Sequence, residues 1–265
     1  MSALSSEMRT HLHDHGYLAI QSLISPEAVI QLQAIYDRLF TEQAGRGEGN
    51  QYDLAGNDSE TGAARLPQIM HPAKYAPELL DTALYRVVSD LVVDLLGAGA
   101  ETRFEHAICK PPNSGAPTPW HQDAAYWDPS NRYRDISVWV PLQEATLENG
   151  CMHFVPDSHR LDVLPHQSIG GDPTVHGLEL APGQEQHTLN ALACPLPPGG
   201  ATIHGGYTLH YAPENRSTVP RRALILCGRP ADGPTPRKRA MKFPWLEERK
   251  TARMQRTQAA ESEAD

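Results

Sequence analysis

Apolar residues recur at helical spacing in two segments of the first hundred residues. Residues 26–40 read PEAVIQLQAIYDRLF, with Pro26 at the head and Ser25 in the position of an N-cap. Residues 77–97 read PELLDTALYRVVSDLVVDLLG, a second amphipathic pattern that we expect to end at its final glycine. The segment GYLAIQSLI at 16–24 favours a first strand. The pattern therefore predicts a mainly helical N-terminal part that contains one strand.

After Glu101 the pattern changes to short segments rich in β-branched and aromatic residues. Pro, Gly and Asn separate these segments, and the tripeptide ENG at 148–150 is typical of a hairpin turn. Several short strands at this spacing predict an antiparallel β-sandwich or barrel with helical packing outside. The fold class is therefore mainly β with flanking helices. The predicted strands are RFEHAICK, RDISVWVPL, GCMHFVP, GATIHGG, TLHYA and RRALILCG.

Three segments lack hydrophobic periodicity. Residues 43–64 are polar and rich in glycine, which predicts a loop, and residues 157–190 form a longer polar segment of the kind that is often functional. The last segment is basic, and it is either a docking surface or, more simply, a solvated helix with a frayed end. We expect one domain over residues 1–230, with a helical part over 1–100 and a β part over 101–230, followed by a charged tail over 231–265.

Composition narrows the class of protein. The 265 residues are 40% hydrophobic and 21% charged, enough for a sizeable core and against a disordered chain. No apolar run of about 18 residues predicts a membrane span, and the first residues do not resemble a secretory signal. The net charge of −9 argues against a general nucleic-acid binder. Four widely spaced cysteines without a CxxC pair argue against a zinc ribbon and indicate reduced thiols in a cytoplasmic protein.

The segment PWHQDAAYW contains an H-x-D pattern formed by His121 and Asp123. On a strand, residues two apart point to the same side, so these two side chains could bind one metal ion, with Trp120 and Gln122 on the opposite face. His210 is the candidate for a third ligand, because a closed sheet can bring its strand alongside. Two His and one carboxylate that leave other metal positions open are typical of non-haem Fe(II) oxygenases. A zinc hydrolase would more often use three His, or two His and a Glu.

Arg221 begins the last predicted strand, eleven residues after His210. A dianionic 2-oxoacid that chelates iron at one end needs a cation at the other, and a guanidinium holds a carboxylate with two parallel hydrogen bonds. Arg222 is expected to point to the other face. His204 competes with His210 for the role of metal ligand, and we favour His210.

The stretches TPWHQDAAYW, ATLENGCMHFVPDSH and LHYAPENRSTVPRRAL resemble the phytanoyl-CoA dioxygenase (PhyH) family of Fe(II)/2-oxoglutarate-dependent oxygenases. The resemblance covers roughly residues 10–230 and is weakest before residue 100. It implies a double-stranded β-helix, the jelly-roll or cupin-like core of that family. It also implies iron ligands at His121, Asp123 and His210, an anchor for the distal carboxylate of 2-oxoglutarate at Arg221, and pocket-lining positions at Trp139, Gln122 and His106.

Two positions refine this resemblance. Many relatives place Ser or Thr two residues after the last His, whereas this chain has Ala212, so we expect Arg221 to rely on Thr202 or on water. Related halogenases have Ala or Gly at the position of Asp123, so the carboxylate here favours hydroxylation.

The sequence thus predicts an enzyme that uses Fe(II), 2-oxoglutarate and O2 to hydroxylate a C–H bond of a small organic acid or natural-product-like substrate. Succinate and CO2 would be released. The substrate pocket is expected to take its lining from residues 43–75, 124–135 and 157–190, with an aromatic and cationic surface formed by Tyr126, Trp127, Arg132 and Arg134. Two alternatives remain, a zinc-dependent hydrolase or isomerase and a catalytically silent jelly-roll binding protein. A small molecule is the expected partner, with no nucleic acid and no membrane, and the oligomeric state is not predicted.

Overall fold

A large antiparallel sheet runs across the molecule, in the strand order β1-β12-β7-β14-β4-β3-β2. The computed structural model describes residues 4–58, 63–113, 116–239 and 241–264. The strands of this sheet are β1 (Tyr17–Ile20), β2 (Gln51–Asp53), β3 (Pro67–Met70), β4 (Glu101–Lys110), β7 (Ile136–Pro141), β12 (Ala201–Gly205) and β14 (Arg221–Arg229).

A smaller antiparallel sheet faces the large one, in the order β11-β8-β13-β5. Its strands are β5 (Thr118–His121), β8 (Met152–Phe154), β11 (Leu192–Cys194) and β13 (His210–Ala212). Two short ladders lie beside these sheets, β9 (His166–Ser168) with β10 (Leu178–Leu180), and β6 (Asn131–Arg132) with β15 (Thr235–Pro236). The α-helices are α1 (Ser6–His15), α2 (Pro26–Thr41), α3 (Ala83–Leu96), α4 (Pro244–Glu248) and α5 (Ala252–Ala264).

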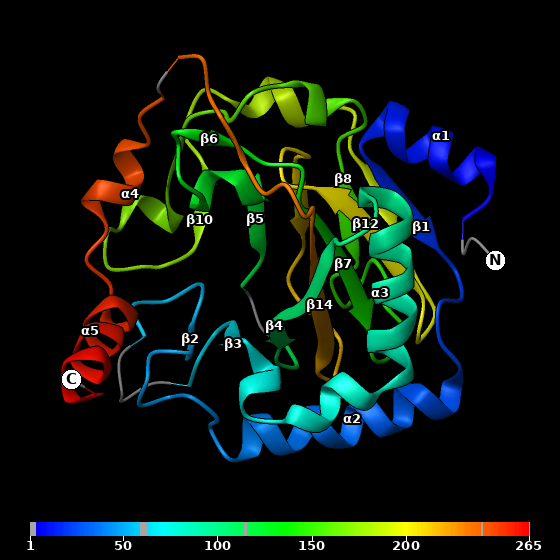
Figure 1. Cartoon of the computed structure of the whole chain (residues 1–265). Coiled ribbons are helices and arrows are strands. Elements are labelled where there is room, and N and C mark those ends of the chain that lie inside the picture. The colour runs from blue at the N-terminus through cyan, green and yellow to red at the C-terminus, as the bar shows by residue number, and fades with distance from the viewer. Residues whose placement is uncertain (1–3, 59–62, 114–115, 240, 265) are drawn as a thin grey trace.

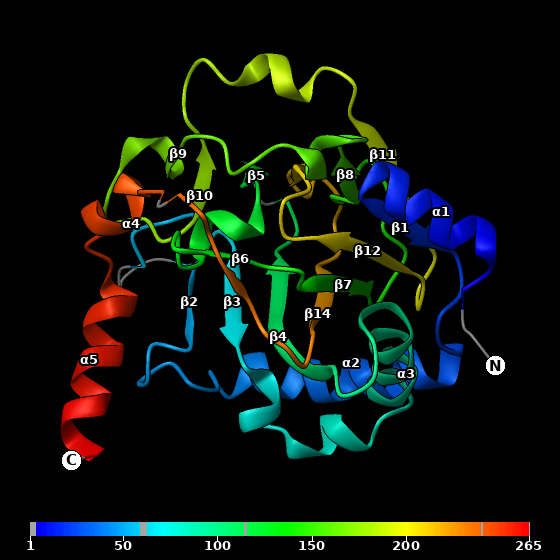
Figure 2. The same cartoon turned by 45° about the horizontal axis from the view of Figure 1, so that its top comes forward.

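The two faces of the large sheet pack against different partners. Helices α2 and α3 cover one face, as Figures 1 and 2 show. This layer buries Leu39 and Leu91 from the helices against alternate side chains of β7 and β14, such as Val138 and Leu224. The opposite face meets the small sheet across a second buried cluster that includes Trp139. The expected mainly β fold with flanking helices is confirmed, and the space between the two sheets is where a cavity forms.

The predicted helix at 26–40 is confirmed as α2, and the Ser25 hydroxyl accepts a hydrogen bond from the Ala28 amide as its N-cap. The predicted helix over 77–97 is divided into a 3₁₀ turn over Pro77–Asp81 and then α3. Thr82 separates them, because its extended backbone (φ −77°, ψ 157°) makes it the N-cap of α3, accepting from the Tyr85 amide. As expected, Gly97 ends α3.

The turn at 148–150 forms, with Gly150 at φ 94°, but the prediction of a hairpin there is wrong. It follows β7, which belongs to the large sheet, and precedes β8, which belongs to the small one. Such a connection lets the chain cross between layers, which local turn chemistry does not reveal. Strand β2 lies within the loop predicted over 43–64, and the β9–β10 ladder lies within the segment 157–190.

The basic C-terminal segment packs against the body of the protein beside β2 and β10 (Figures 1 and 2). Phe243 and Trp245 are buried, and the Trp245 indole donates to the Ala125 carbonyl (2.9 Å). Arg256 of α5 forms an ion pair with Asp58. The segment is therefore anchored to the body of the protein, while the described side chains of α5 over 252–262 stay partly or fully exposed, as expected for a solvated helix. None of the described helices is long and apolar enough to cross a membrane.

Candidate active site

His121, Asp123 and His210 come together between the two sheets, and one potential ligand atom from each lies within 4.8 Å of the others. His121 ends β5 and His210 begins β13, where the two are direct partners across the ladder. The nearer carboxylate oxygen, Asp123 Oδ1, lies 3.8 Å from His121 Nε2 and 3.5 Å from His210 Nε2. The expectation that Asp123 continues the strand is wrong, because the strand ends at His121 and Asp123 opens a 3₁₀ turn. That turn still brings its carboxylate to the imidazoles.

Backbone carbonyls orient both imidazoles. His121 Nδ1 donates to the Pro119 carbonyl (2.7 Å), and His210 Nδ1 donates to the Thr208 carbonyl (2.9 Å). A histidine held in this way presents the lone pair of its Nε2 to a metal ion. Burial, followed by the neighbouring His210, lowers the pKa of His121 to about 3, so this imidazole is neutral at physiological pH. His121 is therefore in the neutral form that a metal ion requires of a histidine ligand.

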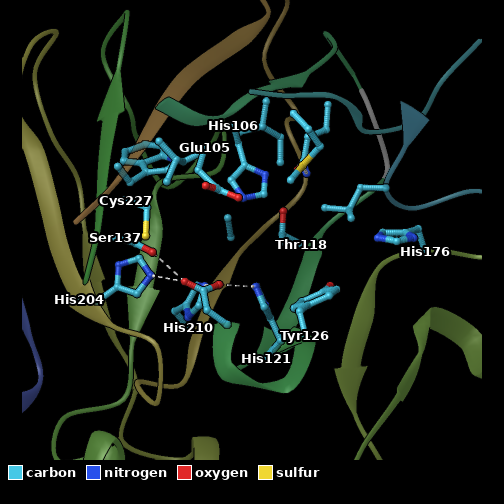
Figure 3. Close-up of a pocket in the computed structure, with 18 of the residues that line it drawn as sticks. Glu105, His106, Thr118, His121, Tyr126, Ser137, His176, His204, His210 and Cys227 are labelled. Atoms are coloured by element: carbon cyan, nitrogen blue, oxygen red, sulfur yellow. Dashed lines mark hydrogen bonds and ion pairs between the residues drawn. The ribbon is translucent and has the colours of Figure 1, made fainter. Parts of the chain in front are cut away.

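The second oxygen of Asp123 is held by other residues. The Ser137 hydroxyl donates to Oδ2 (2.8 Å), and His204 Nε2 lies 3.4 Å from the same oxygen. Burial by itself would raise the pKa of Asp123, but the imidazoles of His210 and His204 outweigh it and lower the pKa well below its usual range. Figure 3 shows His210 between His204 and His121. His204 thus faces the oxygen turned away from the other two imidazoles, which agrees with the preference for His210 as third ligand.

Arg221 is only 1% exposed and lines the same cavity. Its Nε and Nη1 atoms have no hydrogen-bond partner, and it forms no ion pair within the described residues. The guanidinium lies 5.4 Å from the centre of the Trp139 ring. Burial lowers the pKa of Arg221 to about 10, which still leaves it charged at neutral pH. A buried cation without a counter-charge is costly, so this guanidinium is suited to the carboxylate of a bound ligand.

Lys110 is a second buried cation beside Arg221, and sequence reasoning missed it. It is fully buried, is the direct partner of Arg221 across the β4–β14 ladder, and donates through Nζ to the Ala116 carbonyl (2.9 Å). The signal in the sequence is a lysine that follows the apolar residues AIC, but only the strand register relates it to Arg221. Thr202 is also buried with its hydroxyl unpartnered, and Ala212 lines the cavity.

Of the other residues predicted to line the pocket, two do so and one does not. Trp139 and His106 line the cavity, whereas Gln122 is not among the lining residues. The Gln122 side chain is fully buried, donating to the Tyr207 carbonyl (2.8 Å) and accepting from the Leu164 amide (2.8 Å). The assignment of Gln122 to the pocket is therefore corrected. Its amide links the chain just before the turn that begins at Asp123 to the loops that contain Leu164 and Tyr207.

The family model for phytanoyl-CoA dioxygenase (PhyH) matches residues 12–223 of this chain. The chain belongs to this family. A curated relative, the probable alpha-ketoglutarate-dependent hypophosphite dioxygenase of Stutzerimonas stutzeri, is 27% identical over 225 residues, covering 83% of this chain and 77% of that protein. Sequence similarity thus extends well beyond the three motifs.

Solved structures agree with the family assignment. EvdO2 from Micromonospora carbonacea var. aurantiaca is 38% identical, with a TM-score of 0.78 over 92% of this chain and 99% of that one. Its complex with 2-oxoglutarate matches with a TM-score of 0.77 at 36% identity, over 92% of this chain and 97% of that one. The carbocyclase SnoK from nogalamycin biosynthesis, at 21% identity and a TM-score of 0.69 over 94% of this chain and 92% of that one, supports the fold. This PhyH-family protein is an Fe(II)- and 2-oxoglutarate-dependent oxygenase with a jelly-roll core.

The cavity of this PhyH-family enzyme has a volume of about 350 Å³ and a mixed polar and aromatic wall. All three segments predicted to line it contribute, for example through Tyr52, Tyr126 and His176. Trp127 lines it as expected, but Arg132 and Arg134 do not. These two arginines turn outward, Arg132 toward Asp162 (3.5 Å) and Arg134 to an ion pair with Asp232.

Two further lining residues, Arg249 and Arg253, come from the basic C-terminal segment. The sequence showed that this segment is basic, but it did not predict that these two arginines line the cavity. The segment also lies beyond the residues that the family model matches. The boundary expected at residue 230 stays a prediction.

Proposed function

We propose that this enzyme hydroxylates an unactivated C–H bond of a small natural-product-like molecule or organic acid, with release of succinate and CO2. In this proposal His121, Asp123 and His210 hold Fe(II), and Arg221 holds the distal carboxylate of 2-oxoglutarate. The observation that carries it is the unpaired, buried guanidinium of Arg221 in the same cavity as the metal-ligand triad.

The donor set fits the metal. Two imidazole nitrogens and one carboxylate oxygen come together, a set that leaves other positions of an octahedral ion free. When bound, Fe(II) and 2-oxoglutarate supply the oxidising chemistry, and the protein decides where that chemistry acts. Arg221 and the Trp139 ring would fix the orientation of the co-substrate, because a guanidinium fork binds a carboxylate in one plane. Ser137 would keep Asp123 in place for the metal.

Several structural neighbours favour a small natural product as substrate. SnoN and SnoK are named as an epimerase and a carbocyclase from nogalamycin biosynthesis, and EctD was solved with 2-oxoglutarate and 5-hydroxyectoine. The carboxylate at Asp123 supports hydroxylation over halogenation, since it occupies the position that a halide would need. The four cysteines are all free, which agrees with a cytoplasmic enzyme.

Anaerobic titration of the apoprotein with Fe(II) and then 2-oxoglutarate tests this assignment. We expect the weak visible charge-transfer band of the iron chelate to form, and to be lost in His210→Ala. His153→Ala is the matched control, because His153 donates to the Cys151 carbonyl (3.2 Å) and is not among the cavity-lining residues.

A positive result justifies a substrate screen by succinate release. The proposal fails if wild-type protein gives no band while His153→Ala and wild type are both folded. Turnover that persists without oxygen, or that survives Arg221→Ala, would instead favour the zinc-dependent hydrolase or isomerase.

A further inference from the structure

Four arginines line the cavity in addition to Arg221, and they differ in their partners. Two belong to the large sheet and have acidic partners: Arg103 lies 3.5 Å from Glu105, and Arg229 lies 2.9 Å from Asp135. The other two, Arg249 and Arg253, come from the C-terminal segment and form no ion pair with any acidic residue in the described chain. The wall on the side of the C-terminal segment therefore carries positive charge that no acidic residue in the described part of the chain neutralises.

Arg249 lies between α4 and α5 with its guanidinium 5.6 Å from the centre of the Tyr126 ring. One Nη1 hydrogen is donated to the His176 carbonyl (3.1 Å), and the buried Nε has no hydrogen-bond partner among the described residues. A buried N–H without an acceptor is unfavourable unless a ligand supplies one. Arg249 thus has donors available to the cavity.

Arg253 lies on the first turn of α5, with its guanidinium 4.8 Å from the centre of the Tyr52 ring. Its Nε donates to the Gly49 carbonyl (3.1 Å), and its Nη1 donates to His176 Nε2 (3.1 Å). His176 accepts this bond as a neutral imidazole, because burial and then Arg249 and Arg253 hold its pKa well below the usual range. His176 therefore orients the two arginines without neutralising them.

The C-terminal segment is anchored on both sides of these arginines. Before them, the Trp245 indole donates to the Ala125 carbonyl (2.9 Å). After them, Arg256 pairs with Asp58 and the Thr257 hydroxyl bonds to the Glu48 carbonyl (3.4 Å). The positions of Arg249 and Arg253 are thus set by the packing of their own segment, which pre-organises them for a ligand.

This charged wall lies close to the metal-ligand triad. The Tyr126 ring, which Arg249 faces, lies edge-on to His121 with 6.3 Å between ring centres. Figure 3 shows Tyr126 next to His121 and His176 farther along the same side of the pocket. A small molecule bound through Arg249 would therefore extend from this wall toward the metal.

We infer that Arg249 and Arg253 form an anion subsite for a carboxylate or phosphate group of the substrate. The inference rests on the proposed function and deepens it, because it restricts the substrate to a negatively charged molecule. The anion accepts hydrogen bonds from the free guanidinium N–H groups and supplies the counter-charge that the two arginines lack. Tyr52 and Tyr126 border the bound group, and the co-substrate occupies Arg221 instead.

The test uses full-length protein labelled with [15N]arginine and loaded with Zn(II) and saturating 2-oxoglutarate, so that the Arg221 site is filled. The Nε–H signals of Arg249 and Arg253, assigned with R249K and R253K, are followed during titration with inorganic phosphate and, separately, with acetate. We expect saturable shifts of both signals with at least one anion and an unshifted Arg221 signal. Preference for phosphate or for acetate identifies the kind of group the substrate carries.

Variants then test whether these arginines are the binding groups. In R249Q the Arg253 signal should report binding weakened by about tenfold, the loss expected for one charge-assisted hydrogen bond. R249K, which keeps the charge, should bind more tightly than R249Q. R103Q is the matched control, because it removes one charge from the part of the cavity lined by β4, and its dissociation constant should stay within about twofold of wild type.

Two results would overturn the subsite. One is the absence of a saturable shift at Arg249 and Arg253 with either anion, in protein that still binds 2-oxoglutarate. The other is that R103Q and R249Q weaken anion binding equally, which would mean that binding depends on the total charge of the cavity and not on Arg249 itself. Failure to bind 2-oxoglutarate at all counts against the proposed function instead, so the two failures are distinguishable.

Discussion

Arg221 and Lys110 are direct partners across the β14–β4 ladder, and both side chains are almost fully buried. Neither forms an ion pair with an acidic residue in the part of the chain that the structure describes. Burial and mutual repulsion disfavour the charged forms of both side chains, and an anion bound beside them would offset this penalty. This pair is consistent with the proposed role of Arg221 in binding a carboxylate of 2-oxoglutarate.

Replacing Lys110 with Met should change how stability depends on pH. Burial, followed by Arg221, lowers the pKa of Lys110 well below the 10.5 of an unfolded chain. The unfolded state therefore binds more protons than the folded state in the window below 10.5, and the free energy of unfolding rises with pH there. Denaturant unfolding of the apoprotein at increasing pH below 10.5 should show this rise in the free energy of unfolding, and the contribution of Lys110 to the rise should be lost in Lys110→Met. If the free energy of unfolding depends on pH equally in both proteins, burial does not disfavour the charged form of Lys110.

Replacing Arg221 with Lys should weaken 2-oxoglutarate binding. A lysine cannot form the paired, parallel hydrogen bonds of a guanidinium, so we expect a dissociation constant about 10- to 100-fold higher, measured with the Fe(II) chelate band. Arg222→Lys is the matched control. Arg222 points to the other face and binds Asp37 through Nε (2.6 Å) and Nη2 (3.1 Å), so its replacement should leave co-substrate binding unchanged.

Removing the hydroxyl of Ser137 should weaken metal binding. This hydroxyl donates to Asp123 Oδ2 and so restrains the carboxylate that faces the two imidazoles. Loss of such a supporting hydrogen bond typically reduces metal affinity by about 10- to 100-fold. Titration of Ser137→Ala with Fe(II) under anaerobic conditions measures this. Ser89→Ala on α3, whose hydroxyl has no hydrogen-bond partner in the described structure, should bind iron like wild type.

Acid should destabilise the apoprotein partly through His166. Burial lowers the pKa of His166 from 6.5 to about 4, so between these values the unfolded state binds more protons than the folded one. Stability contributed by the neutral imidazole is complete above about pH 6.5 and is lost as the pH falls toward 4, by on the order of 3 kcal/mol. Unfolding of His166→Gln should depend less steeply on pH over this range. His13→Gln, at a side chain that is 85% exposed, should keep the wild-type slope.

Two of the three candidate metal ligands were predictable because the pattern depends on residue identity and short spacing. The H-x-D pattern places His121 and Asp123 near each other whether Asp123 lies on a strand or, as found, at the start of a turn. His210 and Arg221 were assigned through the family resemblance, and the ladders β13–β5 and β14–β4 explain how they reach the site.

The local sequence pattern gave wrong predictions for residues whose side chains form hydrogen bonds that periodicity does not reveal. Gln122 looked like a pocket residue beside the H-x-D pattern, yet its amide is used entirely by loop carbonyls and amides. The helical pattern at 77–97 continued through Thr82, but its hydroxyl caps α3 and so ends one element and begins the next. The partners of Gln122 lie far away in the sequence. Thr82 caps the nearby Tyr85 amide, but hydrophobic periodicity carries no signal for the extended backbone that this cap requires.

The sequence by itself predicted the helices α2 and α3, the β-rich second half and the H-x-D pair, and its motifs, through the family resemblance, added His210 and Arg221 as candidates. The helices, the β-rich half and the H-x-D pair follow from periodicity, capping and the chemistry of residue types, all of which are local. Only the tertiary structure decided that Lys110 lies beside Arg221, that Gln122 faces the loops, and that Arg249 and Arg253 line the cavity. Each of these depends on strand register or on the packing of segments far apart in the chain, and such long-range contacts leave no periodic signal in the sequence.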